Sequence, residues 1–315
     1  MATLTARISL KGDEPDGPED YLSTSLGVIF PDDIVNQHGD AEHSLLYASP
    51  KLPKTLLIEL ADPEGETDRR LFSHYLWNAS LLLAELIERD SLDDDEGEEK
   101  QDRGLGGDIS FDTRGLHTLE LGAGTALPSI MAGLLGAAGV VVTDYPAPAV
   151  MKTLRENVAR NIKPDLAPVG KSSLVTTSIL VEGHEWGVFD SSSSSSSAFP
   201  SSHAHLSDRL FVADCLWMPW QHENLRRSIG YFLKKTAEAR AWVVAGFHTG
   251  RAKMAPFFDA TALREEGGVE VERMWERDCD GVEREWDSER EDDITERKRW
   301  LVVCVLKRCE GMVGV

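Results

Sequence analysis

The feature that most constrains the fold is a regular alternation of strand-like and helix-like segments that begins at His117. Five strand patterns, each followed by a helix pattern or a loop, lie at 117–121, 139–145, 173–181, 209–217 and 240–249. Helix patterns lie at 126–137, 148–162, 221–239 and 253–266, and two last strand patterns, 269–276 and 299–308, have no helix between them. Such alternation is typical of a parallel sheet covered by helices on both faces, and the last pair favours an antiparallel final strand. We therefore predict an α/β fold with a seven-stranded sheet.

The region before this alternation is less regular. Strand patterns at 24–30 and Leu56–Leu60 predict a hairpin-like cap, and helical spacing of apolar residues within 69–89 predicts one helix. Residues 1–20 are polar, acidic and contain Pro and Gly, so we expect them to be disordered. The chain is thus predicted to consist of a disordered N-terminus (1–20), a small strand and helix cap (21–90) and a main domain (111–315), with an acidic insertion at 91–110.

Negative charge is concentrated in two segments. The formal net charge is −21, and residues 88–102 and 276–296 contribute −7 and −8 of it. We predict solvated acidic insertions at 91–110 and 278–296, and a flexible Ser-rich loop at 190–203. No basic patch suited to nucleic acid is found, so nucleic acid is not an expected partner. A basic protein partner is compatible with the charge; the alternative is that the acidic loops only keep the protein soluble.

Several further classes of protein are excluded by simple features. The four cysteines, Cys215, Cys279, Cys304 and Cys309, show neither CxxC nor His-paired spacing, so we expect reduced thiols and no metal site. No apolar run approaches the ~20 residues of a membrane span, and the N-terminus lacks the apolar core of a signal peptide. We therefore expect a cytoplasmic protein that does not bind membranes.

The stretch "LELGAGTALP" (119–128), followed by "VVVTDY" (140–145), predicts a ligand site. Gly122 and Gly124 allow a sharp turn after the first strand of the main domain and leave room for a ligand against the backbone. The following helix directs free N–H groups toward the same crevice. Asp144, 22 residues after Gly122, ends the next strand, where a carboxylate can accept hydrogen bonds from ribose hydroxyls. The pattern indicates a nucleoside site, the alternative being a glycine turn with only a structural role.

The same stretch argues against a dinucleotide. A dinucleotide fingerprint needs a third small residue at position 127, where this chain has Leu127, followed by Pro128. No basic residue is present there to meet a phosphate. These features favour a nucleoside ligand without pyrophosphate, and S-adenosylmethionine (SAM) is the natural candidate. An oxidoreductase that uses a nicotinamide cofactor is disfavoured.

A second constellation, "ADCLWMPWQHENL" (213–225), follows the fourth strand of the main domain. Asp214 ends this strand at the same sheet edge, and Trp217 and Trp220 follow in a loop. An acid flanked by aromatic rings suits a cationic or amine-bearing substrate, because aromatic faces attract positive charge. The alternative is that the tryptophans are core or lid residues. His222 and His248 lie near the same edge, and we expect both to be structural.

These residues resemble a known family. "LELGAGTALPSI", "VVTDYP", "ADCLWMPWQHENL" and the "HTG" at 248–250 are similar to a fungal branch of the seven-β-strand, class I methyltransferases, historically labelled nicotinamide N-methyltransferase-like. "LGVIFPDDI" and "SHYLWNASLLLAELI" extend the resemblance to roughly residues 20–310. The branch is similar to the methyltransferases that modify the N-terminus and adjacent lysine of translation elongation factor 1-alpha. It implies a Rossmann-like sheet and SAM as the cofactor.

The resemblance also implies roles for single residues. Asp214 and Trp217 are implied to face the reacting centre, although related lysine methyltransferases have Asp-x-x-Tyr where this chain has Asp214-Cys-Leu-Trp217. A mechanism that needs that tyrosine hydroxyl is therefore in doubt. Cofactor contacts are implied for seven positions: Trp77, Gly122, Ala123, Gly124, Asp144, Trp186 and Ala213.

The function expected from these observations is SAM-dependent methylation of the N-terminal α-amine and adjacent lysine of elongation factor 1-alpha, by a monomer. Three alternatives remain at this point. The chain could methylate a small, nicotinamide-like molecule, or a lysine of another protein. It could also be a silent SAM-binding or scaffold protein, although Gly122, Gly124, Asp144 and Asp214 are all present.

Overall fold

The computed structural model describes residues 3–12, 35–39, 43–61, 75–92, 104–189, 198–291 and 293–314. Its centre is an eight-stranded sheet in the order β12-β11-β13-β10-β9-β6-β7-β8. The strands of this sheet are β6 (His117–Leu121), β7 (Gly139–Asp144), β8 (Ile179–Gly183), β9 (Arg209–Ala213), β10 (Arg240–Gly246), β11 (Val269–Asp278), β12 (Glu283–Glu285) and β13 (Trp300–Arg308).

The strand directions agree with the predicted topology. β8, β7, β6, β9 and β10 are parallel neighbours, and β13 is antiparallel to both β10 and β11. The order reverses between β6 and β9, which is where an open parallel sheet binds its ligands. All seven predicted strands are present, so the α/β class and the antiparallel last strand are confirmed. The eighth strand, β12, lies in a segment that the sequence analysis assigned to an acidic insertion.

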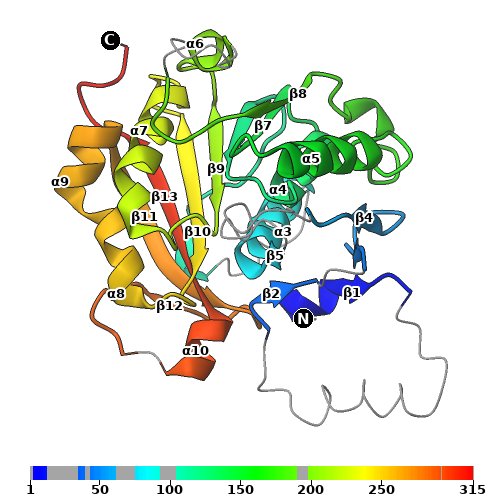
Figure 1. The fold of residues 1–315 in the computed structure, drawn as a ribbon, viewed down its shortest axis with the longest axis horizontal. Coiled ribbons are helices and arrows are strands. Elements are labelled where there is room, and N and C mark those ends of the chain that lie inside the picture. Colours follow the sequence, from blue (N-terminus) through cyan, green and yellow to red (C-terminus); the bar gives the residue numbers. More distant parts are fainter. Residues whose placement is uncertain are drawn as a thin grey trace.

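Helices cover both faces of this sheet (Figure 1). The helices of the described residues are α3 (Asn78–Leu92), α4 (Leu127–Leu134), α5 (Pro148–Asn161), α6 (Phe199–His203), α7 (His222–Phe232), α8 (Arg251–Met254), α9 (Ala260–Ala262) and α10 (Ile294–Arg299). Short 3₁₀ turns are η1 (Leu4–Arg7), η2 (Gly104–Gly106), η3 (Ser172–Leu174), η4 (Pro219–Gln221) and η5 (Ala255–Phe258), and η6 (Leu263–Gly267) is a π turn. Figure 1 shows α7, α8 and α9 on one side of the sheet and α3, α4 and α5 on the other.

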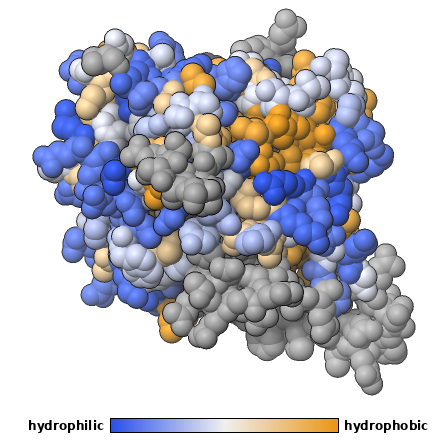
Figure 2. All heavy atoms as spheres, turned by 45° about the horizontal axis from the view of Figure 1, so that its top comes forward, coloured by the Kyte–Doolittle hydropathy of each residue, from blue (hydrophilic) through white to orange (hydrophobic). Residues whose placement is uncertain are grey.

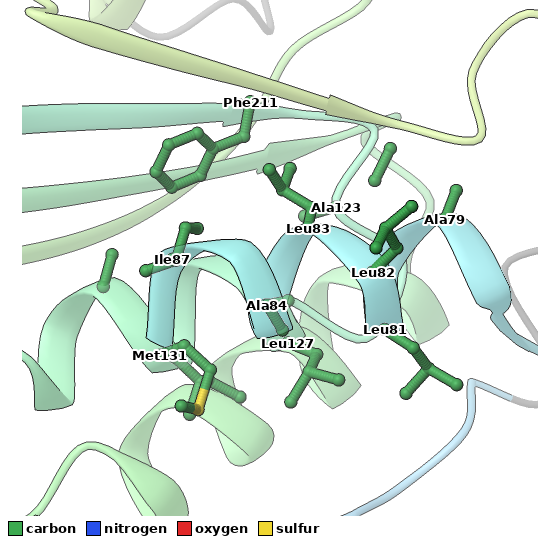
Figure 3. Packing of buried hydrophobic residues seen from close by; sticks show 14 of the residues in the cluster. Ala79, Leu81, Leu82, Leu83, Ala84, Ile87, Ala123, Leu127, Met131 and Phe211 are labelled. Carbon is green, nitrogen blue, oxygen red and sulfur yellow. The ribbon is translucent and has the colours of Figure 1, made fainter. Parts of the chain in front are cut away.

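The two faces carry separate apolar cores because side chains alternate along each strand. On β9, Phe211 and Ala213 join the core beneath α3, α4 and α5, whereas Leu210 and Val212 join the core beneath α7. Figure 3 shows Leu83 of α3 pointing toward the strand that bears Phe211, with Leu127 of α4 close to the helix from the other side. The central strands are thus buried on both faces, which fixes the positions of their carboxyl ends.

Helix α3 begins later than its sequence pattern suggests. The helical spacing predicts a start near residue 69, but Leu76 and Trp77 form strand β5, and the helix begins at Asn78. β5 pairs antiparallel with β2 (Gln37–His38). Asn78 is buried and donates its side-chain N–H to the Val35 carbonyl at 2.9 Å. This short pairing places Trp77 at the entrance to the helix, facing the sheet edge where the ligand site is predicted.

The N-terminal cap is a three-stranded antiparallel sheet in the order β1-β3-β4, formed by β1 (Ile8–Leu10), β3 (Leu45–Tyr47) and β4 (Leu56–Ile58). The strand predicted at Leu56–Leu60 is present, whereas the one predicted at 24–30 lies outside the described residues. The expectation of disorder for 1–20 is wrong for residues 3–12. There Leu4 is buried, and its N–H donates to the Cys279 carbonyl at 2.8 Å.

The predicted insertions are only partly loops. In the range 91–110, Ser91 and Ile109 are buried, and the Leu105 N–H donates to Glu283 Oε2 at 2.7 Å. In 190–203, residues 199–203 form α6, with Phe199 buried. In 278–296, β12 and α10 are formed because arginines neutralise the acids at close range. The helix predicted at 253–266 is broken into α8, η5, α9 and η6, with Pro256 and Asp259 at the breaks.

No helix in the described part of the chain is long and apolar enough to cross a membrane. Figure 2 shows a mostly hydrophilic face that is interrupted by one hydrophobic area.

Candidate functional site

A pocket of about 880 Å³, including the open space at its mouth, lies at the carboxyl ends of β6, β7 and β9. All nine residues to which the resemblance gives a cofactor or substrate role line this pocket: Trp77, Gly122, Ala123, Gly124, Asp144, Trp186, Ala213, Asp214 and Trp217. They come from segments more than 130 residues apart in the chain. The parallel strands bring them together, because such strands end at a common edge.

The glycine turn after β6 is fitted closely to its surroundings. Gly122 has φ 65° and Gly124 has φ 55°, both in the left-handed region that favours glycine. A Cβ at Gly122 would lie 2.7 Å from Cys215 Sγ and 3.0 Å from the Trp186 ring, whereas one at Gly124 would meet nothing within 4 Å. The turn therefore keeps the backbone bare on the side that faces the pocket.

Asp144 at the end of β7 holds this turn. Its Oδ2 accepts the Gly124 N–H at 2.7 Å, and its Oδ1 accepts the Tyr145 N–H at 2.6 Å. Burial raises the pKa of Asp144 to about 6, although the two backbone hydrogen bonds oppose the rise. Each carboxylate oxygen has a second lone-pair direction that can accept from a ligand hydroxyl.

Glu120 on β6 is a buried acid that the sequence analysis missed. Its Oε2 accepts the Ser129 N–H at 3.1 Å in the first turn of α4, and Oε1 has no hydrogen-bond partner among the described residues. Burial raises its pKa to about 8, with the nearby Asp144 adding to the rise. The signal was an acid at an inward-facing position of a strand, directly before the glycine turn. Glu120 supports α4 and does not line the pocket.

Asp214 follows β9 in a conformation that is rare for a residue with a side chain. Its φ is 59°, which costs free energy and is often found at functional sites. Its Oδ1 accepts the Gly246 N–H at 3.2 Å. Burial raises the pKa of Asp214, while the charge of His248 and the Gly246 hydrogen bond act against that rise. The strained backbone turns this carboxylate toward the pocket.

Aromatic side chains surround the two acids. Trp77 makes an edge contact with Tyr75, with ring centroids 6.1 Å apart, and both rings line the pocket with Trp186 and Trp217. Trp220 is 71% exposed and does not line the pocket, so it is not one of the aromatic rings that flank the acid. Tyr75 and Tyr145 both line the pocket and were missed in the sequence. They bring phenolic hydroxyls to a site whose Asp-x-x-Tyr position is occupied by Trp217.

Two histidines and a cysteine at the site are structural or neutral. His184 Nε2 lies 3.0 Å from Ser228 Oγ, and burial lowers its pKa to about 4, so the ring is neutral at pH 7. His222 Nε2 lies 2.9 Å from the Leu216 carbonyl. Burial raises the pKa of the Cys215 thiol, which makes it a poor nucleophile. Within the described residues, no cluster of three or more His, Cys, Asp or Glu side chains could hold a metal ion.

Comparison with known proteins identifies the family. A family model described as lysine methyltransferase matches residues 66–262, which is more than half of the chain. The chain belongs to the lysine methyltransferase family. The match spans α3, the glycine turn, Asp144, Asp214 and His248, and so includes every strand that forms the pocket.

Three fungal relatives in this family carry the name protein N-terminal and lysine N-methyltransferase. The protein of Gibberella zeae is 31% identical over 66% of this chain and 70% of its own length. Those of Schizosaccharomyces pombe and Aspergillus fumigatus are 27% and 29% identical over 65% and 67% of this chain, covering 68% and 70% of their own lengths.

One solved structure extends the likeness of fold across most of the chain. A protein from Streptococcus mutans, described as a candidate SAM-dependent methyltransferase, aligns with a TM-score of 0.50 at 10% identity. The alignment covers 92% of this chain and 65%, less than two thirds, of the solved chain. At this identity the likeness concerns the fold, which is the Rossmann-like methyltransferase architecture.

SAM, the cofactor that a methyltransferase family implies, fits the pocket. The nucleoside part of such a ligand needs a bare turn and a carboxylate, which Gly122 and Asp144 provide. A ligand with phosphates would need cations, and no Lys or Arg is among the described residues that line the pocket. The pocket therefore suits a nucleoside cofactor without phosphate groups and does not suit a dinucleotide.

Proposed function

We propose that this chain is a SAM-dependent protein N-methyltransferase that modifies the N-terminal α-amine and adjacent lysine of translation elongation factor 1-alpha. The observation that carries the proposal is the buried Asp214, bordered by the Trp217 ring at the mouth of the nucleoside pocket. The names of the fungal relatives support a protein substrate with these two kinds of amine. We further propose that the enzyme acts as a monomer in the cytoplasm.

In this proposal the cofactor is held by residues at the ends of β6, β7, β8 and β9 and by Trp77 of β5. Asp144 accepts hydrogen bonds from the ribose hydroxyls, and the turn at Gly122, Ala123 and Gly124 supports the methionine and ribose portion. Trp186 flanks the adenine, and the backbone of Ala213 contacts the adenosine. Trp77, in β5 directly before α3, covers the bound cofactor.

When bound, SAM supplies an electrophilic methyl group on a positively charged sulfur. The chain's main task is to orient a neutral amine in line with that methyl group, and orientation can contribute roughly 7–11 kcal/mol to lowering the barrier. The amine must first lose a proton. An α-amino group titrates near 7.7–8.0 and a lysine near 10.4, so the N-terminus is the easier substrate at neutral pH.

Asp214 and Trp217 act on the amine. The Asp214 carboxylate accepts a hydrogen bond from it and holds it at the reacting centre. Before the amine loses its proton, the face of the Trp217 ring attracts its positive charge, an interaction of about 0.5–2 kcal/mol. Asp214 is close enough to the pocket to receive the proton directly or through one water molecule.

The test is methyl transfer to recombinant elongation factor 1-alpha, followed by mass spectrometry. Wild-type enzyme should add methyl groups to a free N-terminus and to the adjacent lysine, and an N-terminally acetylated substrate should accept methyl groups only on the lysine. Asp214→Asn, which keeps the shape but removes the charge, should reduce transfer at least tenfold. Transfer to pyridine amines such as nicotinamide, with none to the elongation factor, would overturn the proposal in favour of a small-molecule enzyme.

A further inference from the structure

His248, which we expected to be only structural, has an unsatisfied buried atom beside Asp214. Its Nδ1 lies 3.8 Å from Asp214 Oδ1, too far for a hydrogen bond, and has no hydrogen-bond partner among the described residues. Its imidazole stacks on Trp77, with centroids 4.7 Å apart and planes at 24°. A buried polar atom without a partner is costly and calls for an explanation. Here the carboxylate of Asp214, which we place at the reacting centre, lies within ion-pair distance.

The position of His248 is determined by a tightly braced loop. The loop joins β10 to α8, and Arg251, the first residue of α8, donates to Glu276 Oε1 at 2.6 Å and to Oε2 at 3.2 Å. The Arg251 guanidinium also lies 4.0 Å from the centroid of Phe247. Gly246 leaves the space that the imidazole uses, because a Cβ there would lie 3.2 Å from His248 Nδ1. The ring is held against Asp214 from both ends of the loop.

We infer that His248 is a positioning residue that forms an electrostatic pair with Asp214 and thereby keeps this carboxylate ionised and able to accept the proton of the substrate ammonium. The inference deepens the proposed function and rests on it. The ammonium gives its proton to the pair, and the nitrogen lone pair then forms the N–C bond while the C–S bond breaks, its electrons remaining on sulfur. The proton leaves the pair to solvent after turnover.

The charges around the pair favour this role. Three titratable groups on this side of the sheet are acidic or neutral: Asp144 on β7, Glu120 on β6, and the thiol of Cys215 next to Asp214. Arg297 on α10 approaches Gly250, two residues beyond His248. Burial raises the pKa of Asp214, and the charge of His248 opposes this rise. Without this charge, Asp214 would be protonated at a higher pH and would no longer accept a proton from the amine.

The experiment compares binding of SAM, whose sulfur is cationic, with binding of S-adenosylhomocysteine (SAH), whose sulfur is neutral. The Kd ratio is measured by calorimetry between pH 5 and 9. An ionised Asp214 favours the cation, so the preference for SAM should fall as Asp214 becomes protonated. His248→Gln should move the midpoint of that fall to higher pH by about one unit. At pH values between the two midpoints, the Kd ratio of the variant should then differ from that of wild type by up to about tenfold.

Two controls make the result specific. His222→Gln removes a buried imidazole that is bonded to the Leu216 carbonyl instead of facing Asp214, and should leave the midpoint unchanged. Asp214→Asn should abolish the pH dependence of the ratio. If His248→Gln does not fold, Gly246→Ala, which displaces the imidazole, replaces it.

An unchanged midpoint in a folded His248 variant would overturn the inference, even with SAM bound normally. Failure of wild type to bind either ligand would instead contradict the proposed function itself. In the methyl-transfer assay, His248→Gln should also move the acid limb of kcat/KM to higher pH, whereas a merely structural role would lower activity equally at all pH values.

Discussion

Gly122 and Gly124 share a positive φ but differ in what a side chain would meet. An L-residue in this conformation costs roughly 1–2 kcal/mol at either position. At Gly122 an added Cβ would also collide with Cys215 Sγ at 2.7 Å. Gly124→Ala should therefore lower the free energy of unfolding by about 1–2 kcal/mol, and Gly122→Ala by about 2–5 kcal/mol, since overpacking adds ~1–3 kcal/mol. Urea unfolding without ligand measures both, and equal losses would show that the contact with Cys215 is not tight.

Glu120 makes a distinct prediction about pH. Its pKa in the folded protein is raised from 4.5 to about 8, so proton binding stabilises the fold fully below pH 4.5, and this stability is lost as pH rises through 8. Wild type should lose a few kcal/mol of unfolding free energy between pH 6.5 and 8.5. Glu120→Gln, which cannot ionise, should lose clearly less. The pKa of His184 is lowered to about 4 and that of Asp144 is raised to about 6, so both groups change stability below this pH range and do not obscure it. Parallel pH curves for the two proteins would refute the buried-acid description.

One buried acid on β11 joins β12, the segment between β12 and α10, and the start of α8. Glu276 is fully buried and accepts hydrogen bonds from Arg251, Arg284 and Arg290 at 2.6–3.2 Å. Removing the anion leaves three guanidinium groups close together around a neutral side chain, although Arg284 still pairs with Glu296. Glu276→Gln should therefore destabilise the protein by about 3–5 kcal/mol, as measured by urea unfolding.

The matched control for Glu276 is a half-buried acid on the same strand. Glu270 pairs with Arg264 and Lys307 at the surface, so Glu270→Gln should cost less than about 1 kcal/mol. A similar cost for the two variants would mean that the Glu276 cluster gains no strength from burial.

The elements that the sequence predicted well are those with a clear pattern of apolar residues. The buried strands β7, β9, β10 and β13 have apolar runs of three or more residues, and Asp144 and Asp214 could be placed in the site because parallel strands end together. β12 and α10 were missed because their acids suggest solvation. Only the fold shows that Arg284 of β12 pairs with Glu276 and with Glu296 of α10, and that Arg290 pairs with Glu276. Likewise β3 is only three residues long, and its Leu45 and Tyr47 become buried through pairing with distant strands.

The relation between His248 and Asp214 could not be read from the sequence. The two residues lie 34 positions apart, and their contact depends on a loop that is held by Glu276 from another strand. Tyr75 reaches the pocket from the N-terminal part of the chain for a similar reason. Residues at strand ends were therefore predictable from local patterns, whereas loop residues depended on long-range contacts.

The chain as a whole is strongly acidic, with a net charge of −21. If its substrate presents a basic N-terminal segment, as we propose, long-range attraction should speed the encounter of enzyme and substrate. Raising the salt concentration from about 0.05 to 0.5 M should lower kcat/KM for the protein substrate by about tenfold or more and leave kcat nearly unchanged, because salt screens charges beyond a few ångströms. Steady-state kinetics with elongation factor 1-alpha at several salt concentrations measure this effect. A kcat/KM that does not depend on salt would argue against electrostatic recognition by the acidic surface.

The most direct measurement is calorimetric titration of wild type and Asp144→Ala with SAH. Wild type should bind with micromolar affinity. The variant should bind more weakly by roughly 1–3 kcal/mol, or about 5- to 150-fold, because it loses hydrogen bonds to a charged group and the anchor of the glycine turn. No binding by wild type, or equal affinity in the two proteins, would contradict the conclusion that this pocket is the cofactor site of a methyltransferase.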